Sequence, residues 1–462
     1  MVKWFVRVAA VAATLTLVAG CGSGRDDADG GTGSTGDPGS EVSSDVLQFG
    51  DLPSPCGPGD PSGSPDQGVD DSTVTIGFGD DAGYQPSPGL GQEAGDAVRA
   101  MIEWCNEQGG INGREVVGNY YDAKITEINN VMTEACSQVF MLVGQFFSLP
   151  EAAEPTRLGC GLPTVPGISG GALAMAPLAV SPFPDPIDQY NIGPMAILAR
   201  EFPEEAGKAA MMVADFPGIA SNLARFERTV PQAGWNLLGD CYTTYPILGV
   251  ADFKPYVQRL KECGAEMVYT VDVEPNMQNI LDAAAQLDYE PIWVNGASVA
   301  SASFAKWNVN GNGDRLYFGD SFVPASYDAE GSANAAFLAA VEKTGGDAAY
   351  FGQVSASAFL LWATAAKECG DDLTRDCVMT ELRKITDWDA GGLSAPQNPA
   401  ENLIDDCTQV MNLQGTEFVQ WLPEDEGDFE CDPSWAVTVE PPVDDMERLQ
   451  VGDDRVAHNI IP

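Results

Sequence analysis

Short apolar strands alternate with amphipathic helices along most of this chain, and this alternation restricts its fold more than any other feature. The first unit pairs a strand predicted at Val74–Phe78 with a helix at Gln92–Gln108, which stops at Gly109-Gly110. Further strands are predicted at Val116–Tyr121, Phe140–Val143 and Pro163–Val165, and helices at Glu127–Val139 and Glu151–Leu158. Repeated strand–helix units predict a parallel sheet with helices on both faces.

The same alternation restarts after the Pro-rich segment Ser181–Pro194. Strands are predicted at Ala209–Ala214, Trp235–Leu238, Met267–Val271 and Ile292–Val294, with helices at Ser221–Gln232, Phe253–Glu262 and Asn276–Leu287. Helical patterns follow at Ser332–Lys343, Gln353–Cys369 and Thr374–Ile385, and a hairpin at Thr408–Leu413 and Glu417–Leu422. We therefore predict an α/β fold with two doubly wound lobes.

The N-terminus has the pattern of an export signal. Lys3 and Arg7 precede an apolar stretch, Val8–Ala19, that is too short to span a bilayer comfortably, so residues 1–20 are predicted to be a signal peptide. The stretch runs into Val18-Ala19-Gly20-Cys21, which resembles the bacterial lipobox, whose cysteine is acylated and becomes the mature N-terminus. We expect a lipoprotein anchored to the outer face of the cell membrane by acyl chains such as palmitate. An ordinary signal peptide followed by a chance cysteine is the alternative.

Composition divides the remainder of the chain. Residues 22–71 are mostly Gly, Ser, Asp and Pro, which predicts that the segment 21–71 is a flexible, acidic tether. The following stretch of about 370 residues is too long for one compact core and suits two lobes with a cleft between them.

Cysteine usage indicates an oxidising compartment. Of 11 cysteines, an even number remains once Cys21 is acylated. They show no CxxC spacing, and the one histidine, His458, lies near the C-terminus, so we expect no metal site. Connectivity stays open at this point. We favour the local pairs Cys241 with Cys263, Cys369 with Cys377 and Cys407 with Cys431; Cys136 with Cys160 and Cys56 with Cys105 would complete the set.

The formal net charge of −45 argues against nucleic acid and anionic membrane surfaces as partners, because both would be repelled. It says less about a ligand, since a cleft carries its own local charge. Solubility of an exposed protein explains the acidity better than electrostatic selection of a cation.

A motif after the first predicted helix carries a family resemblance. Gly109–Arg114 reads Gly-Gly-Ile-Asn-Gly-Arg and is followed by Tyr121-Asp122-Ala123. This resembles the substrate-binding proteins of branched-chain amino acid ABC transporters, which are leucine-binding-protein-like, type I periplasmic-binding proteins. The resemblance extends roughly over residues 72–420 and includes Val143-Gly144, Asp252-Phe253 and Lys261-Glu262-Cys263-Gly264-Ala265.

The resemblance implies two Rossmann-like lobes joined by three crossovers, with a small-molecule ligand between the strand ends and ABC transporter permease subunits as partners. Ligands of doubly wound sheets do bind outside the carboxyl ends of the strands. We expect lobe 1 to comprise residues 72–191 and 325–388, and lobe 2 residues 192–324 and 389–439. The acidic tail 440–462 is expected to be disordered, and no cofactor is expected.

In the family, two loops of the first lobe hold the carboxylate of an amino acid. The matching loops here are residues 145–148 and 167–170. We predict that Ser148 and Ser169 contact the ligand, together with Ile168 and Gly170. Helix capping is the competing role for both serines.

The second lobe departs from the family pattern. Amino acid binders have an acid that pairs with the ligand's ammonium group, but the matching loop here begins with Asn295 and lacks one. Either Asp272 or Glu274 replaces it from the neighbouring loop, or the ligand is not an α-amino acid. Amides, urea-like compounds, aromatic acids and small peptides are bound by proteins that look like this one.

Further candidates for ligand contact lie near strand and helix ends. Tyr84 follows the first strand, Asp320 or Phe322 lies at the late crossover, and Tyr350 precedes a long helix. Each has a competing structural role, as loop cover or as part of the core.

No arrangement for catalysis stands out in the sequence. A nucleophile with a histidine activator is ruled out by the single His458, and no phosphate-binding GxxxxGK[ST] loop is present. We therefore expect a solute-binding protein and not an enzyme. The alternatives are a sensor of the same fold that signals to a membrane partner, and a structural or adhesive surface protein.

Overall fold

The computed structural model describes residues 48–169, 173, 175–215, 220–246, 250–272, 274–296 and 299–440. These described residues belong to one compact unit. The predicted signal peptide, the lipidation site Cys21, the predicted ligand contact Gly170 and the tail beyond residue 440 lie outside the described residues.

Lobe 1 is built on a parallel sheet with the strand order β4-β3-β5-β6. The central strand β3 (Thr73–Asp80) pairs with β4 (Glu115–Asp122) on one side and with β5 (Leu142–Val143) on the other, and β6 (Thr164–Val165) follows. This order places a switch point between β3 and β5, as expected of a doubly wound sheet.

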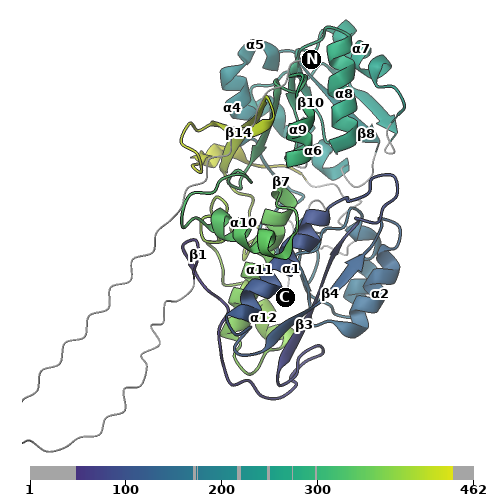
Figure 1. The fold of residues 1–462 in the computed structure, drawn as a ribbon. Helices are drawn as coiled ribbons and strands as arrows, with labels where there is room; N and C mark the ends of the chain where they lie inside the picture. The colour runs from purple at the N-terminus through teal and green to yellow at the C-terminus, as the bar shows by residue number, and fades with distance from the viewer. Residues whose placement is uncertain are drawn as a thin grey trace, which may run out of the picture. The chain divides into compact units, whose positions relative to one another are not determined.

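The helices of lobe 1 come from two distant parts of the chain. They are α1 (Gln92–Glu107), α2 (Ile128–Gln138), α3 (Glu154–Gly159), α10 (Ala333–Thr344), α11 (Tyr350–Glu368) and α12 (Arg375–Leu382). Figure 1 shows α10 and α11, in green, beside α1 in blue. Phe359 and Trp362 of α11 are fully buried, so the late helices complete a core that the early residues began.

Lobe 2 is built on a larger sheet with the strand order β9-β8-β10-β11-β12-β13-β14. Strands β8 to β12 are parallel, and β13 and β14 form an antiparallel hairpin. The strands are β8 (Ala209–Asp215), β9 (Thr243–Pro246), β10 (Met267–Tyr269), β11 (Ile292–Val294), β12 (Leu316–Asp320), β13 (Cys407–Gln414) and β14 (Glu417–Leu422). The helices are α4 (Gly193–Glu201), α5 (Pro203–Ala206), α6 (Ala220–Thr229), α7 (Lys254–Cys263), α8 (Glu274–Gln286) and α9 (Ala302–Trp307). The two doubly wound lobes predicted from the alternation are therefore present.

Three connections join the lobes, as far as the structure describes the chain: residues 166–192, 321–332 and 383–406. The first ends in β7 (Gln189–Asn191), which pairs with β16 (Ala436–Thr438) near the C-terminal end of the described chain. The exact lobe boundaries stay a prediction.

One predicted strand is wrong. Residues 235–238 form only a single bridge, between Leu237 and Ala209, and the edge strand of lobe 2 is β9. The apolar residues of this stretch pack into the core without forming a strand. Trp235 is buried and donates its indole N–H to the Met195 carbonyl at 2.9 Å.

The predicted tether is also corrected over residues 48–71, which pack on lobe 1. Phe49 is buried against Trp104, with ring centroids 5.4 Å apart, and a disulfide joins Cys56 to Cys105. The Gln67 amide donates to the Val139 carbonyl at 2.9 Å. One buried aromatic ring and one covalent link hold a segment whose composition alone predicts a free chain.

The disulfides follow the favoured pairing. They join Cys56 to Cys105, Cys136 to Cys160, Cys241 to Cys263, Cys369 to Cys377 and Cys407 to Cys431. Within the described part of the chain, no helix is long and apolar enough to cross a membrane.

Candidate functional site

A cavity of about 220 Å³ lies at the carboxyl ends of β10, β11 and β12. Each of the three connections between the lobes contributes to its wall. The contributions are Phe183 and Asp185 from the first, Ser321 from the second with Asp320 just before it, and Ile404 and Asp405 from the third. Lobe 1 adds Tyr350 from the first turn of α11. The shape of the cavity would therefore change if the lobes moved relative to one another.

Aromatic rings form two sides of this cavity. Tyr190, from the first connection, and Tyr269, from lobe 2, line it with their hydroxyl oxygens 3.4 Å apart, and Phe226 stacks on Tyr269 at 3.8 Å. On the other side, Tyr350 packs edge-on against Phe322 with ring centroids 5.9 Å apart. These rings give the cavity rigid apolar walls with polar hydroxyl tips.

A buried amide faces the cavity without a partner. Asn295 follows β11 and is 2% exposed, yet neither its Oδ1 nor its Nδ2 has a hydrogen-bond partner among the described residues. The Oδ1 of Asn222, on α6, is likewise unpartnered there. An unsatisfied buried polar group costs about 1–3 kcal/mol, so an amide left this way at a cavity wall is suited to a ligand.

Two carboxyl groups also line the cavity. Asp320, the last residue of β12, accepts a hydrogen bond from the Phe322 backbone N–H at 3.0 Å, and Asp405 accepts from Asn191 Nδ2 at 3.0 Å and Gln397 Nε2 at 2.9 Å. Burial raises the pKa of Asp320 well above its usual range, and the nearby Asp405 adds to this. Burial also raises the pKa of Asp405. The cavity is thus acidic in character, with carboxyls whose hydrogen bonds come from neutral groups.

The third acid, Asp185, has a partner. Arg225, on α6, is almost completely buried and holds Asp185 through two hydrogen bonds, Nη1 to Oδ1 at 2.6 Å and Nη2 to Oδ2 at 2.9 Å. Its Nη1 also donates to the carbonyls of Pro186 and Gln189. Most of the donors of this guanidinium are therefore satisfied inside the protein.

The structure brings together part of the predicted site. Asn295, Asp320 and Tyr350 line the cavity, whereas Tyr84 lies half-buried in the loop after β3, where its N–H donates to the Asp81 carbonyl at 2.9 Å. That these residues contact a ligand stays a prediction.

The predicted contacts from the loops of lobe 1 do not line this cavity. The backbone N–H of Ser148 donates to Asp81 at 2.7 Å, and Ile168 packs against the core of lobe 1. Ser169 is buried, and its hydroxyl has no hydrogen-bond partner among the residues that the structure describes.

The two acids proposed as replacements lie elsewhere as well. Glu274 begins α8 and accepts hydrogen bonds from the hydroxyls of Ser301 at 2.8 Å and Ser303 at 2.9 Å, so it ties α8 to the start of α9. Asp272 is buried after β10 and does not line the cavity.

Sequence reasoning missed Asp405, Asp185, Tyr190 and Tyr269. The first three lie in the connections between the lobes, and Tyr269 is the last residue of β10. The available signal was positional: a polar or aromatic residue in each segment that crosses between the lobes.

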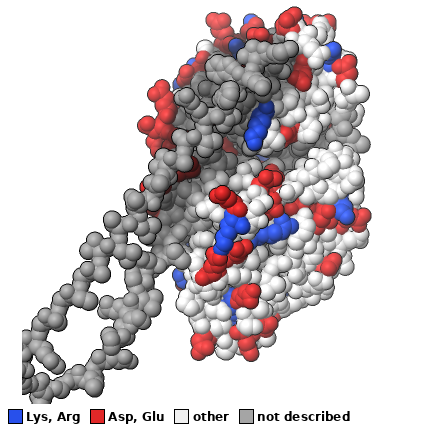
Figure 2. All heavy atoms as spheres, in the orientation of Figure 1, with Lys and Arg blue, Asp and Glu red and all other residues white. Residues whose placement is uncertain are grey.

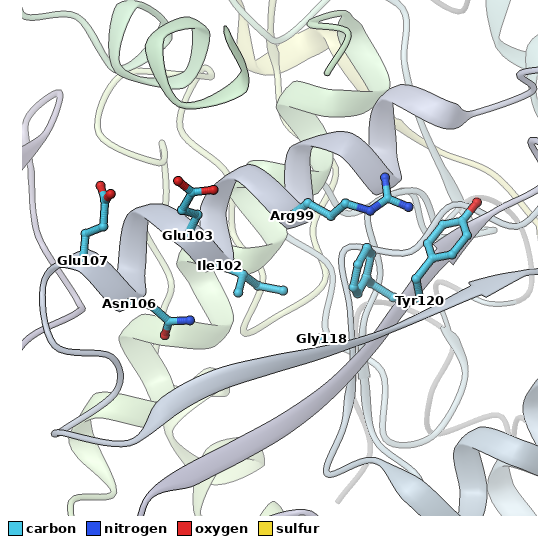
Figure 3. Close-up of a pocket in the computed structure, with 8 residues that line it drawn as sticks. Arg99, Ile102, Glu103, Asn106, Glu107, Gly118 and Tyr120 are labelled. Atoms are coloured by element: carbon cyan, nitrogen blue, oxygen red, sulfur yellow. The ribbon is translucent and has the colours of Figure 1, made fainter. Parts of the chain in front are cut away.

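A second hollow, of about 610 Å³, lies within lobe 1. Its lining residues come from β3, α1 and β4, and Figure 3 shows Arg99 of α1 directed toward Tyr120 of β4. The guanidinium carbon lies 4.3 Å from the centre of the Tyr120 ring, whose hydroxyl donates to Asp80 at 2.6 Å. This hollow belongs to lobe 1 alone, so it is a weaker candidate for a site that links the lobes.

The doubly wound lobes, their three connections and the cavity among them define a two-lobed α/β binding protein. The sequence matches the family described as "Periplasmic binding protein" over residues 73–417, and the chain belongs to this family. No curated protein matches the sequence.

Solved structures of low sequence identity share the fold, which is that of type I periplasmic-binding proteins. One is a fatty acid ABC transporter substrate-binding protein from Thermomonospora curvata, with 16% identity, a TM-score of 0.66, and coverage of 82% of this chain and 97% of that one. A branched chain amino acid ABC transporter from Thermus thermophilus with bound valine has 15% identity, a TM-score of 0.63, and coverage of 80% and 98%. A solute binding protein from R. palustris in complex with 4-hydroxybenzoate has 18% identity, a TM-score of 0.62, and coverage of 79% and 99%.

Proposed function

We propose that this protein is an exported lipoprotein that captures a small polar molecule between its lobes and delivers it to an ABC transporter. The observation that carries the proposal is the cavity itself, because all three connections and both lobes contribute to its wall. Membership of the periplasmic binding protein family supports the same role. No catalytic step is assigned to the cavity.

Capture would work by a shift between open and closed states. A ligand that touches Asn295 in lobe 2 and Tyr350 in lobe 1 favours the arrangement in which both contacts are made. The predicted contacts Ser148 and Ser169 belong to the same proposal, for a ligand that extends toward lobe 1. The structural relatives are described with valine, 4-hydroxybenzoate or fatty acid, so the fold by itself does not specify the ligand.

Thermal unfolding tests the binding role. The purified full chain, in a non-ionic detergent, would be heated with amino acids, amides, urea compounds, small peptides, amines and aromatic acids. A ligand at about 100 times its dissociation constant adds roughly 2.7 kcal/mol to the free energy of unfolding, which is a clear shift of the melting temperature. Absence of any shift across the whole set would contradict the proposal.

Membrane attachment is tested separately. We expect Cys21→Ala to abolish incorporation of labelled palmitate and to release the protein from the membrane fraction. Unchanged labelling and fractionation of Cys21→Ala would show that the lipid proposal is wrong, while leaving the binding proposal intact.

A further inference from the structure

The cavity is lined by carboxyl groups and by no cationic side chain among the described residues. Its ionisable lining residues among those described are Asp185, Asp320, Asp405 and tyrosines, and no Lys, Arg or His contributes to that part of the wall. The internal segments that the structure does not describe contain no ionisable residue in the sequence, so they supply no charge either.

Neither of the two remaining acids forms an ion pair with a described residue. Arg225 is engaged by Asp185 and by backbone carbonyls, whereas Asp320 and Asp405 accept hydrogen bonds from neutral amide groups. Ionising a carboxyl at a buried site without a cation is unfavourable, so the neutral form of both acids is favoured while the cavity is empty. A cation entering the cavity would stabilise the ionised form of both acids, as Arg225 does for Asp185.

The aromatic residues around these acids favour binding of a positively charged ligand. The rings of Tyr190, Tyr269, Tyr350 and Phe183 line the cavity, and aromatic faces attract cations at about 0.5–2 kcal/mol per contact. Asn295, 2% exposed and with both amide atoms unpartnered among the described residues, supplies an orienting acceptor and donor in the same wall. At about 220 Å³, the cavity is smaller than those that hold drug-sized ligands.

The exterior of the protein is also acidic. Figure 2 shows Asp and Glu side chains over both the upper and the lower part of the face drawn, and the chain carries a net charge of −45. A field of this sign concentrates cations near the surface without selecting one. Selection would come from the cavity.

We propose that the ligand is a small organic cation, held between Asp320 and Asp405 and enclosed by the tyrosine rings of the cavity. The inference rests on the proposed solute-binding function and specifies its ligand class. An ammonium group would be the positively charged partner that Asp320 and Asp405 do not have among the described residues. Asn295 would bind a polar substituent of the ligand. A carboxylate in the same place would meet two acids and neutral donors alone.

Matched probes test the charge requirement. Choline would be compared by calorimetry with the neutral alcohol in which carbon replaces its nitrogen, and with the tert-butylacetate anion of similar shape. Benzylamine, benzyl alcohol and benzoate form a second set, and glycine betaine and leucine serve as zwitterions. We expect one of the two cations to bind the full chain at least about tenfold more tightly than its neutral and anionic counterparts.

The other outcomes separate the inference from the proposed function. Tighter binding of a neutral, anionic or zwitterionic probe would overturn the cation inference and leave solute binding in place. No binding by any probe, together with no thermal shift in the wider ligand set, would overturn both.

Substitution of each acid tests whether Asp320 and Asp405 bind the cation. Asp320→Asn and Asp405→Asn are expected to weaken binding of the cation at least about tenfold, and to leave any weak binding of its neutral counterpart unchanged. Asp328→Asn is the control for the first, because Asp328 is exposed on the same connection, and Asp387→Asn, exposed on the third connection, is the control for the second. Equal losses for cation and neutral probe would indicate a structural role and overturn the inference.

Proton release provides a measurement that needs no variant. Choline carries a permanent charge, so protons released when it binds come from the protein. The groups facing Asp320 and Asp405 are Asp185 with Arg225, Asp406, and the hydroxyls of Tyr190, Tyr269 and Tyr350. We expect proton release on binding, and affinity that rises with pH as the carboxyls ionise. Choline binding without proton release at any pH would overturn this assignment.

Discussion

Arg225 and Asp185 form a two-point ion pair behind the cavity wall, with donor–acceptor distances of 2.6 and 2.9 Å. Arg225 comes from α6 of lobe 2, and Asp185 from the first connection between the lobes. The pair therefore fastens a connection to a helix, and it also withdraws the guanidinium from the other two acids of the cavity.

Asp185→Asn should destabilise the protein strongly. Removing one partner of a buried pair leaves an uncompensated buried charge and typically costs about 3–5 kcal/mol; we expect about 3 kcal/mol, because the Asp185 side chain is 20% exposed. Urea unfolding measures this loss. Glu430→Gln is the matched control, since Arg200 holds Glu430 with similar two-point geometry at the surface and exposed pairs contribute under about 1 kcal/mol. Equal effects of the two substitutions would contradict this account.

Replacing Asn295 with leucine should stabilise the empty protein and weaken ligand binding. Asn295→Leu removes a buried group whose two polar atoms have no partners among the described residues, so we expect the empty protein to gain about 1 kcal/mol. The same change should abolish or greatly reduce the thermal shift given by a ligand. Differential scanning calorimetry with and without ligand measures both quantities. A loss of stability in the empty protein would show that Asn295 has a structural partner.

Glu93, in the first turn of α1, should make stability depend on pH. Burial, with Asp80, Asp347 and Asp96 nearby, raises its pKa from 4.5 to about 7. The folded protein therefore holds this proton more tightly than the unfolded chain, and stability falls as pH rises from about 4.5 to about 7. Glu93→Gln should remove about 2 kcal/mol of that fall, as measured by urea unfolding across the range. Glu103→Gln, an exposed position on the same helix, should leave the profile unchanged.

The Cys56–Cys105 disulfide should hold residues 48–71 on lobe 1. It closes a loop with a sequence separation of 49, and chain entropy assigns such a link about 4 kcal/mol. We expect the double substitution Cys56→Ala, Cys105→Ala to lose stability and to become sensitive to cleavage at Asp51, Asp60 or Asp66 by an aspartate-specific protease. Removing the Cys369–Cys377 disulfide, whose separation is 8, should cost about 2 kcal/mol and leave this segment protected. Protection that survives loss of Cys56–Cys105 would assign the packing to Phe49 instead.

The sequence by itself determined the alternation of strands and helices and the nearest cysteine partners. Val74–Phe78 and Gln92–Gln108 were found nearly to their ends, because apolar periodicity and glycine stops act over a few residues. Asn295 and Asp320 were identified from their places at predicted strand or crossover ends, where doubly wound sheets bind ligands.

Only the tertiary structure decided which polar groups meet and which remain without partners. Asp405 reaches the wall that contains Asp320 through the third connection, and Arg225 pairs with Asp185 across lobe 2, so the charge of the cavity depends on contacts between distant parts of the chain. The segment 48–71 likewise looked free by composition, but Phe49 finds a buried place beside Trp104. Local sequence patterns specify individual helices and strands. Burial and pairing depend on how those elements pack, because tertiary contacts join residues that are distant in the sequence.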